Sequence, residues 1–374
     1  MAPQRPQGAG AMYKKGPRQV PRPVPRAAGS PDLYAALDLG TNSCRMLIAE
    51  PRGPGFHVVD SFSKSVQLGT GLEASGRLSR GSMSRTIQAL RICQQKLKRN
   101  KVRRMRLVAT EACRRAANAQ DFIKRVHHET GLTLDIIAPE EEARLAVISC
   151  APLVSRKTEN LLVVDIGGGS TELVWLDLSK VKKRDRPQAI MRLREGLHRG
   201  DAPTTEARVV DWISVPLGVA TLREQFSDVE DDAARFALMS WFFEENLSDF
   251  APYHATEPTE RFQIVGTSGT VTTVAASHLG LKRYDRTKVD GLRMTSDEID
   301  TVIRSYLHMG PGGRRADPRI GSDRHALIMS GAAILQALMR CWPTDRLSVA
   351  DRGLREGLLY AQMSADGVLD TARL

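Results

Sequence analysis

The sequence predicts an α/β protein built from two similar domains with a cleft between them. Short apolar runs typical of strands alternate with stretches of helical periodicity. Hydrophobic residues make up 41% of the 374 residues, which is enough for two cores of ordinary size. One strand–turn–strand pattern also occurs twice. We expect a disordered basic tail at residues 1–32, an N-terminal domain at 33–155 and a C-terminal domain at 156–374.

The first half of the folded chain reads as a hairpin followed by alternating helices and strands. YAALDLG and CRMLIAE are apolar runs about a polar turn, which predicts a β-hairpin. Residues 82–99 have helical periodicity with Ser82 as the cap, 105–110 predict a strand, and 121–131 predict a helix that ends at Gly131. A strand at LTLDIIA and a helix that starts at EEEARL complete this half.

The second half begins with another hairpin, LLVVDIG and STELVWLDL. Residues 180–208 follow, with nine Arg and Lys against four acids, and predict a long solvated hairpin tip. WISVPLG predicts a strand, and VATLREQF and residues 231–250 predict helices. The remainder predicts a strand at RFQIVGTSG, helices at VTTVAASHL and at 325–341, and a last strand, loop and helix in RLSVADRGLREGLLYAQMS.

The two hairpins form an internal repeat. LDLGTNSCRMLIAE (37–50) aligns without gaps on VDIGGGSTELVWLD (164–177), and the alignment pairs Asp38 with Asp165, Gly40 with Gly167, and Ser43 with Ser170. Such a repeat predicts two copies of one domain that each open with the same hairpin. Because ligands usually bind in clefts at domain interfaces, we expect the site between the two copies.

The glycine run at 167–169 is the main candidate for a phosphate-binding loop. The chain has no GxxxxGK[ST] loop, and a strand follows the glycines where a dinucleotide fingerprint requires a helix. Consecutive glycines let a backbone approach a ligand, and their N–H groups can form a concave anion site. Ser170 and Thr171 add hydroxyl donors, and Asp165 suits a hydrated Mg²⁺. The alternative is a tight hairpin whose glycines serve only the turn.

Two further segments favour the phosphate interpretation. IVGTSGTVTTV (264–274) is a strand ending in a Gly/Ser/Thr loop that opens a helix, where free N–H groups favour an anion. PEEEARL (139–145) places three glutamates at the start of a helix. This placement complements the helix dipole, and a glutamate facing the cleft could take a proton from water attacking a phosphate.

The composition favours negatively charged partners. The net charge of +11 favours polyanions, without choosing among nucleic acid, anionic membrane and a phosphate-rich substrate. Residues 1–31 carry six positive charges and no acid, so this tail is solubilising or attracts a polyanion. No apolar run approaches the ~18–20 residues of a membrane span, and we expect a cytoplasmic protein without a membrane partner. Neither zinc nor disulfides are predicted from the scattered cysteines Cys44, Cys93, Cys113, Cys150 and Cys341.

Taken together, the motifs resemble those of the exopolyphosphatase / guanosine pentaphosphate phosphatase (Ppx/GppA) family. In order they are LDLGTNSCRMLIAE, ATEACRRAANAQDF, PEEEARL, VVDIGGGSTELV, ISVPLGVATLREQF, VGTSGTV and ADRGLREGLLYA. The resemblance implies two ribonuclease-H-like domains of the actin/Hsp70/sugar kinase superfamily with the active site between them. It also implies hydrolysis of terminal phosphate from inorganic polyphosphate, or of the 5′ phosphate from guanosine pentaphosphate, with Mg²⁺ or another divalent cation.

The resemblance implies roles for individual residues. Glu142 is the expected base, and Asp165 and Glu172 are tied to metal and phosphate. Asp38, the counterpart of Asp165 in the repeat, is the third metal ligand that we predict. The predicted phosphate-binding residues lie in four segments: Thr41, Asn42, Ser43 and Arg45; Arg114; Gly167, Gly168, Gly169 and Ser170; and Ser268, Gly269 and Thr270.

The chain departs from the family pattern in three places. Ala138 and Pro139 replace the usual Ser-Gly, and the basic segments 180–208 and 314–325 are longer than usual. These segments are either a track for a polyphosphate chain or solvated loops. We also expect a short form, without the extra C-terminal domain of the long family members.

Several functions are compatible with the sequence. The basic composition favours an exopolyphosphatase, and a guanosine pentaphosphate phosphatase is the alternative. Both activities are compatible with one protein. A polyanion-binding regulator without activity fits poorly with the retained acids, and an ATP-dependent kinase has no sequence signal for an adenine pocket. The helix at 325–341 and the family both favour a homodimer, and we expect no specific nucleic acid partner.

Overall fold

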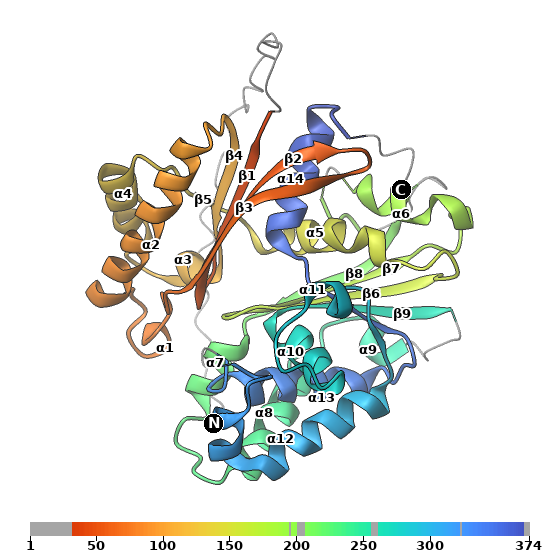
Figure 1. Ribbon diagram of the computed structural model, residues 1–374. Helices are drawn as coiled ribbons and strands as arrows, with labels where there is room; N and C mark the ends of the chain where they lie inside the picture. Colours follow the sequence, from red (N-terminus) through yellow and green to blue (C-terminus); the bar gives the residue numbers. More distant parts are fainter. Residues whose placement is uncertain (1–31, 194–195, 200–205, 256–260, 322–323, 370–374) are drawn as a thin grey trace, which may run out of the picture. The chain divides into compact units, whose positions relative to one another are not determined.

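The computed structural model describes residues 32–193, 196–199, 206–255, 261–321 and 324–369 (Figure 1). The predicted tail at 1–32 therefore lies outside the described residues, apart from Asp32. Parts of the two basic segments, 180–208 and 314–325, lie outside them as well.

The described chain begins with a five-stranded sheet and the helices around it. In chain order these elements are β1 (Tyr34–Leu39), β2 (Ser43–Arg52), β3 (Gly55–Ser65), α1 (Leu72–Ser75), α2 (Arg80–Arg99), β4 (Arg104–Ala109), α3 (Glu111–Arg115), α4 (Ala119–Thr130), β5 (Asp135–Ile136), α5 (Pro139–Cys150) and η1 (Ala151–Leu153).

A six-stranded sheet and its helices follow. They are β6 (Asn160–Ile166), β7 (Thr171–Asp177), η2 (Lys183–Asp185), α6 (Arg186–Met191), β8 (Arg208–Val215), α7 (Val219–Gln225), α8 (Asp232–Glu245), α9 (Pro252–Ala255), β9 (Phe262–Thr267), α10 (Gly269–His278), α11 (Arg286–Val289), β10 (Arg293–Met294), α12 (Ser296–Ala316), α13 (Ile328–Cys341), β11 (Leu347–Ala350) and α14 (Leu354–Ala365).

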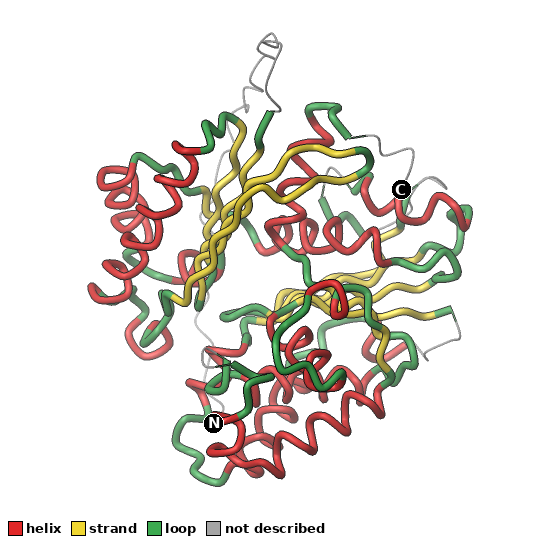
Figure 2. Tube along the Cα trace, viewed as in Figure 1, coloured by secondary structure: helices red, strands yellow, loops and turns green. Residues whose placement is uncertain are grey.

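The two sheets share one topology, which Figure 2 shows as two groups of yellow strands. The first has the order β3-β2-β1-β4-β5, and the second has the equivalent order β8-β7-β6-β9-β11 with β10 added at the edge. In each sheet the first three strands are antiparallel, and the central strand then pairs in parallel with the next, β1 with β4 and β6 with β9. The repeat seen in the hairpins therefore extends to whole sheets.

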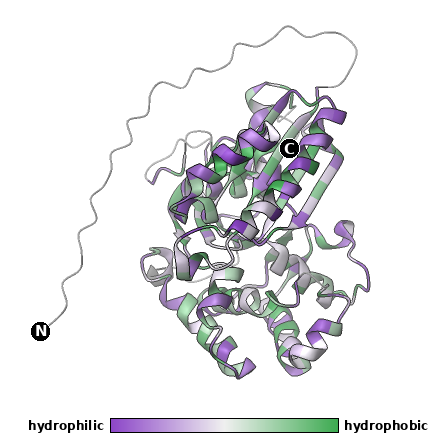
Figure 3. Cartoon of the chain, turned by 90° about the vertical axis from the view of Figure 1, so that its left-hand side faces the viewer, coloured by the Kyte–Doolittle hydropathy of each residue, from purple (hydrophilic) through white to green (hydrophobic). Residues whose placement is uncertain are grey.

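Both sheets are covered on two faces. Helices α2 and α4 are amphipathic and bury one side on the first sheet, while their outward positions are hydrophilic (Figure 3). Helix α14 packs on the opposite face, against β1 and β2. Helices α8, α10, α12 and α13 cover one face of the second sheet, and α5 and α6 cover the other.

The boundary that we predict at residues 155–156 stays a prediction. Helix α5 precedes it and packs on β6 and β7, whereas α14 follows it and packs on β1 and β2. Helices α5 and α14 also contact each other, so the two sheets are joined through this helix pair.

Local expectations were met for both hairpins and for the αL glycine, Gly131, at the end of α4. The predicted cap of α2 was wrong. The helix begins at Arg80, and Ser79 is the N-cap, with its Oγ accepting a hydrogen bond from the N–H of Ser82 at 3.1 Å. Ser82 is buried one turn further in.

The solvated hairpin tip predicted at 180–208 was also wrong for the part that the structure describes. Residues 186–191 form α6, whose Pro187, Ala189, Ile190 and Met191 are buried against the second sheet. Only Lys182, Lys183 and Arg184 form an exposed basic run there. These apolar residues pack against strands that are distant in the sequence. The many charged residues around them made the whole segment look solvent-exposed.

The second basic segment does not form a continuous surface track. Arg314 is buried and pairs with Asp232 at 2.8 Å, and Arg319 pairs with Asp317. Arg324 faces the cleft described below. The helix that favoured a homodimer, α13, is buried along nearly its whole length, so it offers no free face for a partner.

Candidate active site

The two repeated hairpins end in equivalent turns. The N–H of Gly40 donates to the carbonyl of Ser43 at 3.0 Å, and the N–H of Gly167 donates to that of Ser170 at 2.9 Å. Across the two ladders, Asp38 lies opposite Arg45, and Asp165 lies opposite Glu172. The sequence repeat is thus a repeat of backbone geometry, with a charged pair at the end of each hairpin.

Backbone carbonyls of both turns accept hydrogen bonds from N–H groups outside the turns. Those of Thr41 and Asn42 accept from the N–H groups of residues 66, 67 and 69, and those of Gly167 and Gly168 accept from the first residues of α7. Among the described contacts, the N–H groups of Gly168, Gly169 and Ser170 have no acceptor. Successive free N–H groups of this kind make an anion site.

Gly168 and Gly169 are required by close approach between the hairpins, whereas a Cβ at Gly167 would lie 2.8 Å from the carbonyl oxygen of Ser170 within its own turn. None of the three has a positive φ. A Cβ at Gly169 would lie 2.4 Å from Thr41 Oγ1, and a Cβ at Gly168 would lie 3.1 Å from the backbone nitrogen of Asn42. The two hairpin turns therefore touch each other, and only glycine leaves room for this contact. The turn-only explanation therefore does not fit Gly168 and Gly169, although it does fit Gly167.

A third loop joins them at the start of α10. Ser268 is the N-cap, and its Oγ accepts from the N–H of Val271 at 3.0 Å. Gly269 and Thr270 form the first turn of this helix, where N–H groups lack intrahelical acceptors and the dipole favours an anion.

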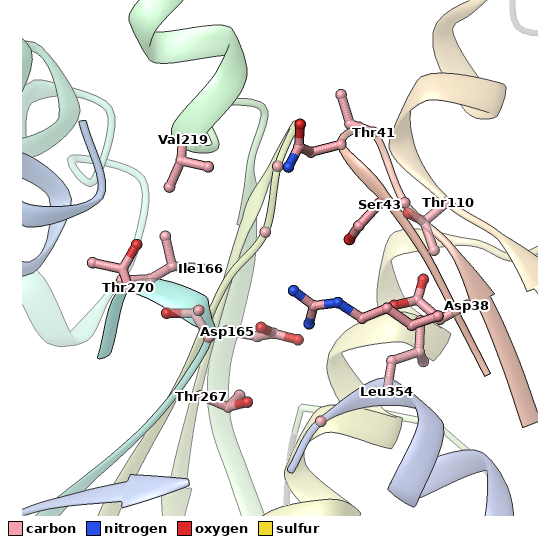
Figure 4. A pocket seen from close by; sticks show the side chains of 18 of the residues that line it. Asp38, Thr41, Ser43, Thr110, Asp165, Ile166, Val219, Thr267, Thr270 and Leu354 are labelled. Carbon is pink, nitrogen blue, oxygen red and sulfur yellow. The ribbon is translucent and has the colours of Figure 1, made fainter. Parts of the chain in front are cut away.

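These loops line a cleft of about 270 Å³ between the two sheets. In Figure 4, Asp38, Thr41, Ser43 and Thr110 lie on one wall, and Asp165, Ile166, Thr267 and Thr270 lie on the other. The structure brings most of the predicted site residues to this cleft: Asp38, Thr41, Asn42, Ser43, Arg45, Glu142, Asp165, Gly167, Gly168, Gly169, Ser170, Ser268, Gly269 and Thr270. Glu172 is buried and Arg114 is partly buried beside it, and neither lines it.

The three glutamates at the start of α5 have separate partners. Glu140 accepts from the N–H of Leu197 at 2.8 Å. Glu141 pairs with Arg106 and Arg144 at 3.0 and 2.8 Å. Glu142 alone lines the cleft. The helix turn that complements the dipole thus also sends one carboxylate into the site.

Buried carboxylates dominate the electrostatics of the cleft. Burial first, and then the charge of Glu172, raises the pKa of Glu142 to about 8. Burial, Glu142 and Asp38 together raise the pKa of Asp165 to about 8. Burial and Asp165 raise that of Glu172 to about 7. A nearby arginine, a metal ion or protonation of a carboxylate relieves this repulsion.

Arg114 joins two of these acids. Its Nη1 donates to Glu142 Oε2 at 2.7 Å and to the carbonyl of Ile137 at 3.0 Å, and its Nε donates to Glu111 Oε2 at 3.0 Å. Its Nη2 lies 2.9 Å from Glu111 Oε2, outside hydrogen-bonding geometry. The buried Oγ1 of Thr41, which lines the cleft, has no hydrogen-bond partner among the described residues. Because buried hydroxyl groups are usually satisfied, this atom indicates where a ligand oxygen would be bound.

The donor set of the cleft fits a divalent cation bound with the substrate. Among the described residues, no three His, Cys, Asp or Glu side chains are grouped closely enough to enclose a metal ion. Mg²⁺ in phosphate sites uses one or two carboxylates together with water and phosphate oxygens, so a closed cage is not required. Asp38 and Asp165 line the cleft and Glu172 is buried next to it. Their role as ligands stays a prediction.

Sequence reasoning missed several residues of the cleft. They include three arginines and a threonine hydroxyl, which are groups that bind phosphate, and two further acids. These residues are Thr110, Glu111, Arg324, Asp351, Arg352 and Arg355. Three of them belong to the ADRGLREG motif, so the motif itself was the available signal. Arg324 is held by the carbonyl of Gly269 at 3.0 Å and Thr273 Oγ1 at 2.6 Å, contacts that no local pattern announces.

Comparison with known proteins identifies the class that this fold and cleft define. The model of the Ppx/GppA phosphatase family matches residues 47–366, and the chain belongs to this family. A guanosine-5′-triphosphate,3′-diphosphate pyrophosphatase of Aeromonas salmonicida is 29% identical over 328 residues, which are 88% of this chain and 59% of that protein. The chain thus spans less than two thirds of that curated relative.

Solved structures of this family have the same fold as this chain. The Aquifex aeolicus member of the Ppx/GppA family has a TM-score of 0.69 at 29% identity, covering 90% of this chain and 98% of that one. An exopolyphosphatase from Cytophaga hutchinsonii has a TM-score of 0.74 at 21% identity, covering 90% and 98%. The predicted fold class is confirmed as two α/β sheets of one topology with a cleft between them, and solved structures of the Ppx/GppA family share this fold.

Proposed function

We propose that this protein is an exopolyphosphatase that hydrolyses the terminal phosphate of inorganic polyphosphate. The observation that carries the proposal is the cleft itself, where three anion-binding turns surround a buried glutamate. The membership of a phosphatase family supports hydrolysis, and the net charge of +11 supports a long polyanion over a small nucleotide.

Glu142 is the base in this proposal. It orients a water molecule in line with the terminal phosphorus and takes its proton as the new P–O bond forms. The P–O bond to the rest of the chain breaks in the same displacement, and the polyphosphate shortened by one phosphate leaves. A pKa of about 8 places this carboxyl near the range in which a general base works best. Arg114 holds Glu142 in place through the 2.7 Å contact, so the carboxylate keeps one orientation toward the cleft.

The turns bind the phosphates. The free N–H groups of Gly168 to Ser170 and of the α10 N-terminus supply donors fixed by the fold, and Arg45 supplies a cation in the cleft. Donors held in place before the reaction stabilise developing charge without reorganisation, which is the main contribution in phosphoryl transfer. A divalent cation held by Asp165, Asp38 and Glu172 would offset charge on the phosphate oxygens.

The alternative is hydrolysis of the 5′ phosphate of guanosine pentaphosphate. The curated relatives favour it, because they are named guanosine-5′-triphosphate,3′-diphosphate pyrophosphatases. The same turns and the same base would serve both substrates. A regulator without activity is less well supported, because Glu142, Asp165 and Glu172 are all retained around one cleft.

The test is phosphate release from long-chain polyphosphate and from guanosine pentaphosphate, side by side, with and without Mg²⁺. Faster metal-dependent release from polyphosphate supports the proposal. Release from the nucleotide alone supports the alternative. No release from either, by a protein shown to be folded, supports the binding regulator.

Cytoplasmic location and a homodimer remain predictions. Among the described residues, no helix is both long and apolar enough to cross a membrane. Because α13 is buried, a dimer would have to use another surface. Sedimentation analysis of the purified protein measures the oligomeric state directly.

A further inference from the structure

Glu111 is a buried acid in the cleft wall that the proposed mechanism does not use. It is the first residue of α3, directly after β4, and only 9% of its surface is exposed. Its Oε2 accepts a hydrogen bond from Arg114 Nε at 3.0 Å and lies 2.9 Å from Arg114 Nη2. Because burying a carboxylate costs free energy, we expect the Glu111–Arg114 pair to have a role in the site.

Glu111 and Glu142 hold Arg114 from two sides. Glu111 contacts the Nε edge of the guanidinium, while Glu142 and the carbonyl of Ile137 contact Nη1. The group is fixed in a plane by three acceptors. The third nitrogen, Nη2, is buried and lies 2.9 Å from the same Glu111 oxygen without hydrogen-bonding geometry.

Glu111 also connects this group to the glycine turn. A Cβ at Gly169 would lie 3.0 Å from Glu111 Cγ, so the Glu111 side chain rests against the turn that carries the free N–H groups. One residue thus contacts both the phosphate turn and the arginine beside the base.

We propose that Glu111 is a positioning residue, which holds the Arg114 guanidinium beside the cleft so that it pairs with Glu142 through one nitrogen only and keeps the orientation that its predicted phosphate contact requires. The proposal rests on the proposed function. Arginine and carboxylate prefer a two-point contact, and Glu142 now receives only one nitrogen. Without Glu111, Arg114 is free to turn Nη2 onto Glu142, and this closer pairing weakens Glu142 as a base and disturbs the predicted phosphate contact of Arg114.

The test compares three substitutions of Glu111. Glu111→Ala removes the acceptor, Glu111→Met removes it while filling the space beside Gly169, and Glu111→Gln keeps one acceptor oxygen. We expect the first two to lower kcat by about 10- to 100-fold, because small misplacements of catalytic groups have effects of this size. Glu111→Gln should recover most of the loss. Glu129→Ala is the matched control, because Glu129 pairs with Arg91 and Arg125 away from the cleft.

A double-substitution cycle separates positioning from a merely structural role. If Glu111 acts through Arg114, Glu111→Ala has no further effect on kcat in an Arg114→Ala background. Equal losses in both backgrounds overturn the proposal, and so does wild-type kcat in both Glu111→Ala and Glu111→Met. Should Glu111→Ala fail to fold, Glu111→Met in the two backgrounds decides.

The outcome stays separable from the proposed function. If the wild-type protein releases phosphate from neither substrate, the proposed function fails, and binding of tripolyphosphate measured by calorimetry decides on Glu111. Equal weakening of binding by Glu111→Ala and Arg114→Ala supports positioning. Wild-type affinity in Glu111→Ala with weakened affinity in Arg114→Ala overturns it.

Discussion

Arg114 Nη1 lies 2.7 Å from Glu142 Oε2, and this contact joins two motifs that are far apart in the sequence. The arginine lies in the last turn of α3, and the glutamate lies in the first turn of α5. A partly buried ion pair in this position orients the carboxylate that faces the cleft. The contact therefore defines which of the three neighbouring glutamates is able to act on a substrate.

Replacing Glu142 by Gln should lower kcat by about 10²–10⁴-fold with a smaller change in KM. The amide oxygen still accepts the hydrogen bond from Arg114, so substrate binding is largely kept while the base is lost. Phosphate release at saturating substrate measures the effect. Glu141→Gln is the control in the same helix turn, since Glu141 pairs with Arg106 and Arg144 away from the cleft. A Glu142→Gln protein as fast as this control would remove Glu142 from the mechanism.

Replacing Gly169 by Ala should separate the two hairpin turns. The new Cβ would lie 2.4 Å from Thr41 Oγ1 and 3.0 Å from Glu111 Cγ, so a wall of the cleft has to shift. We expect a loss of about 1–3 kcal/mol in the free energy of unfolding and a fall of roughly 100-fold in kcat. Urea unfolding and phosphate release measure the two quantities.

Gly312→Ala is the matched control for this substitution. Gly312 lies within α12, and a Cβ there has nothing within 4 Å. Its unfolding free energy should stay the same or rise by about 0.4–1 kcal/mol, with wild-type kcat. If both alanine variants behaved alike, contact between the hairpins would have no importance for activity.

Asp165 should determine the metal requirement. Its pKa of about 8 reflects burial among Glu142 and Asp38, an environment that a cation would stabilise. Asp165→Asn should raise the Mg²⁺ concentration for half-maximal rate by at least about tenfold. Calorimetric titration with the metal alone supplies a readout independent of turnover. Asp177→Asn, at the far end of β7 beside Arg208, should leave both values unchanged, and an equal shift in this control would assign the effect to general charge.

Much of the fold was predictable from local pattern. Each hairpin consists of apolar runs around a Gly-containing turn, so strands, turn and repeat were all readable from 37–50 and 164–177. Strand β3 was missed because it is an edge strand with alternate residues exposed and a Pro/Gly turn before it. Helix α12 was missed because the run Gly310–Pro311–Gly312–Gly313 resembles a helix end, yet the chain continues as helix past a kink at Gly310.

The site residues were predictable only where a short sequence motif contains them. Residues of the glycine turn, the α10 loop and the α5 glutamates are defined by short motifs, and the fold brings them to one cleft. Glu111 and Arg324 were not predictable, because their importance depends on which segments approach them. Arg324 reaches the α10 turn from a loop more than fifty residues away, through contacts with Gly269 and Thr273.

The Asp60–Lys96 pair should give a pH-dependent contribution to stability. Lys96 Nζ donates to Asp60 Oδ1 at 2.6 Å and joins β3 to α2, and this hydrogen bond is the main cause that lowers the pKa of Asp60. A carboxyl with a lowered folded-state pKa stabilises the protein above its unfolded pKa of about 3.9, and this contribution is lost as the pH falls through the folded value. Because both side chains are partly exposed, we expect Asp60→Asn to cost about 0.2–1 kcal/mol at pH 7. Urea unfolding of wild type and variant between pH 7 and pH 3 should show this gap closing toward the acid end, whereas a gap of constant size would mean that the ionised carboxylate is not its source.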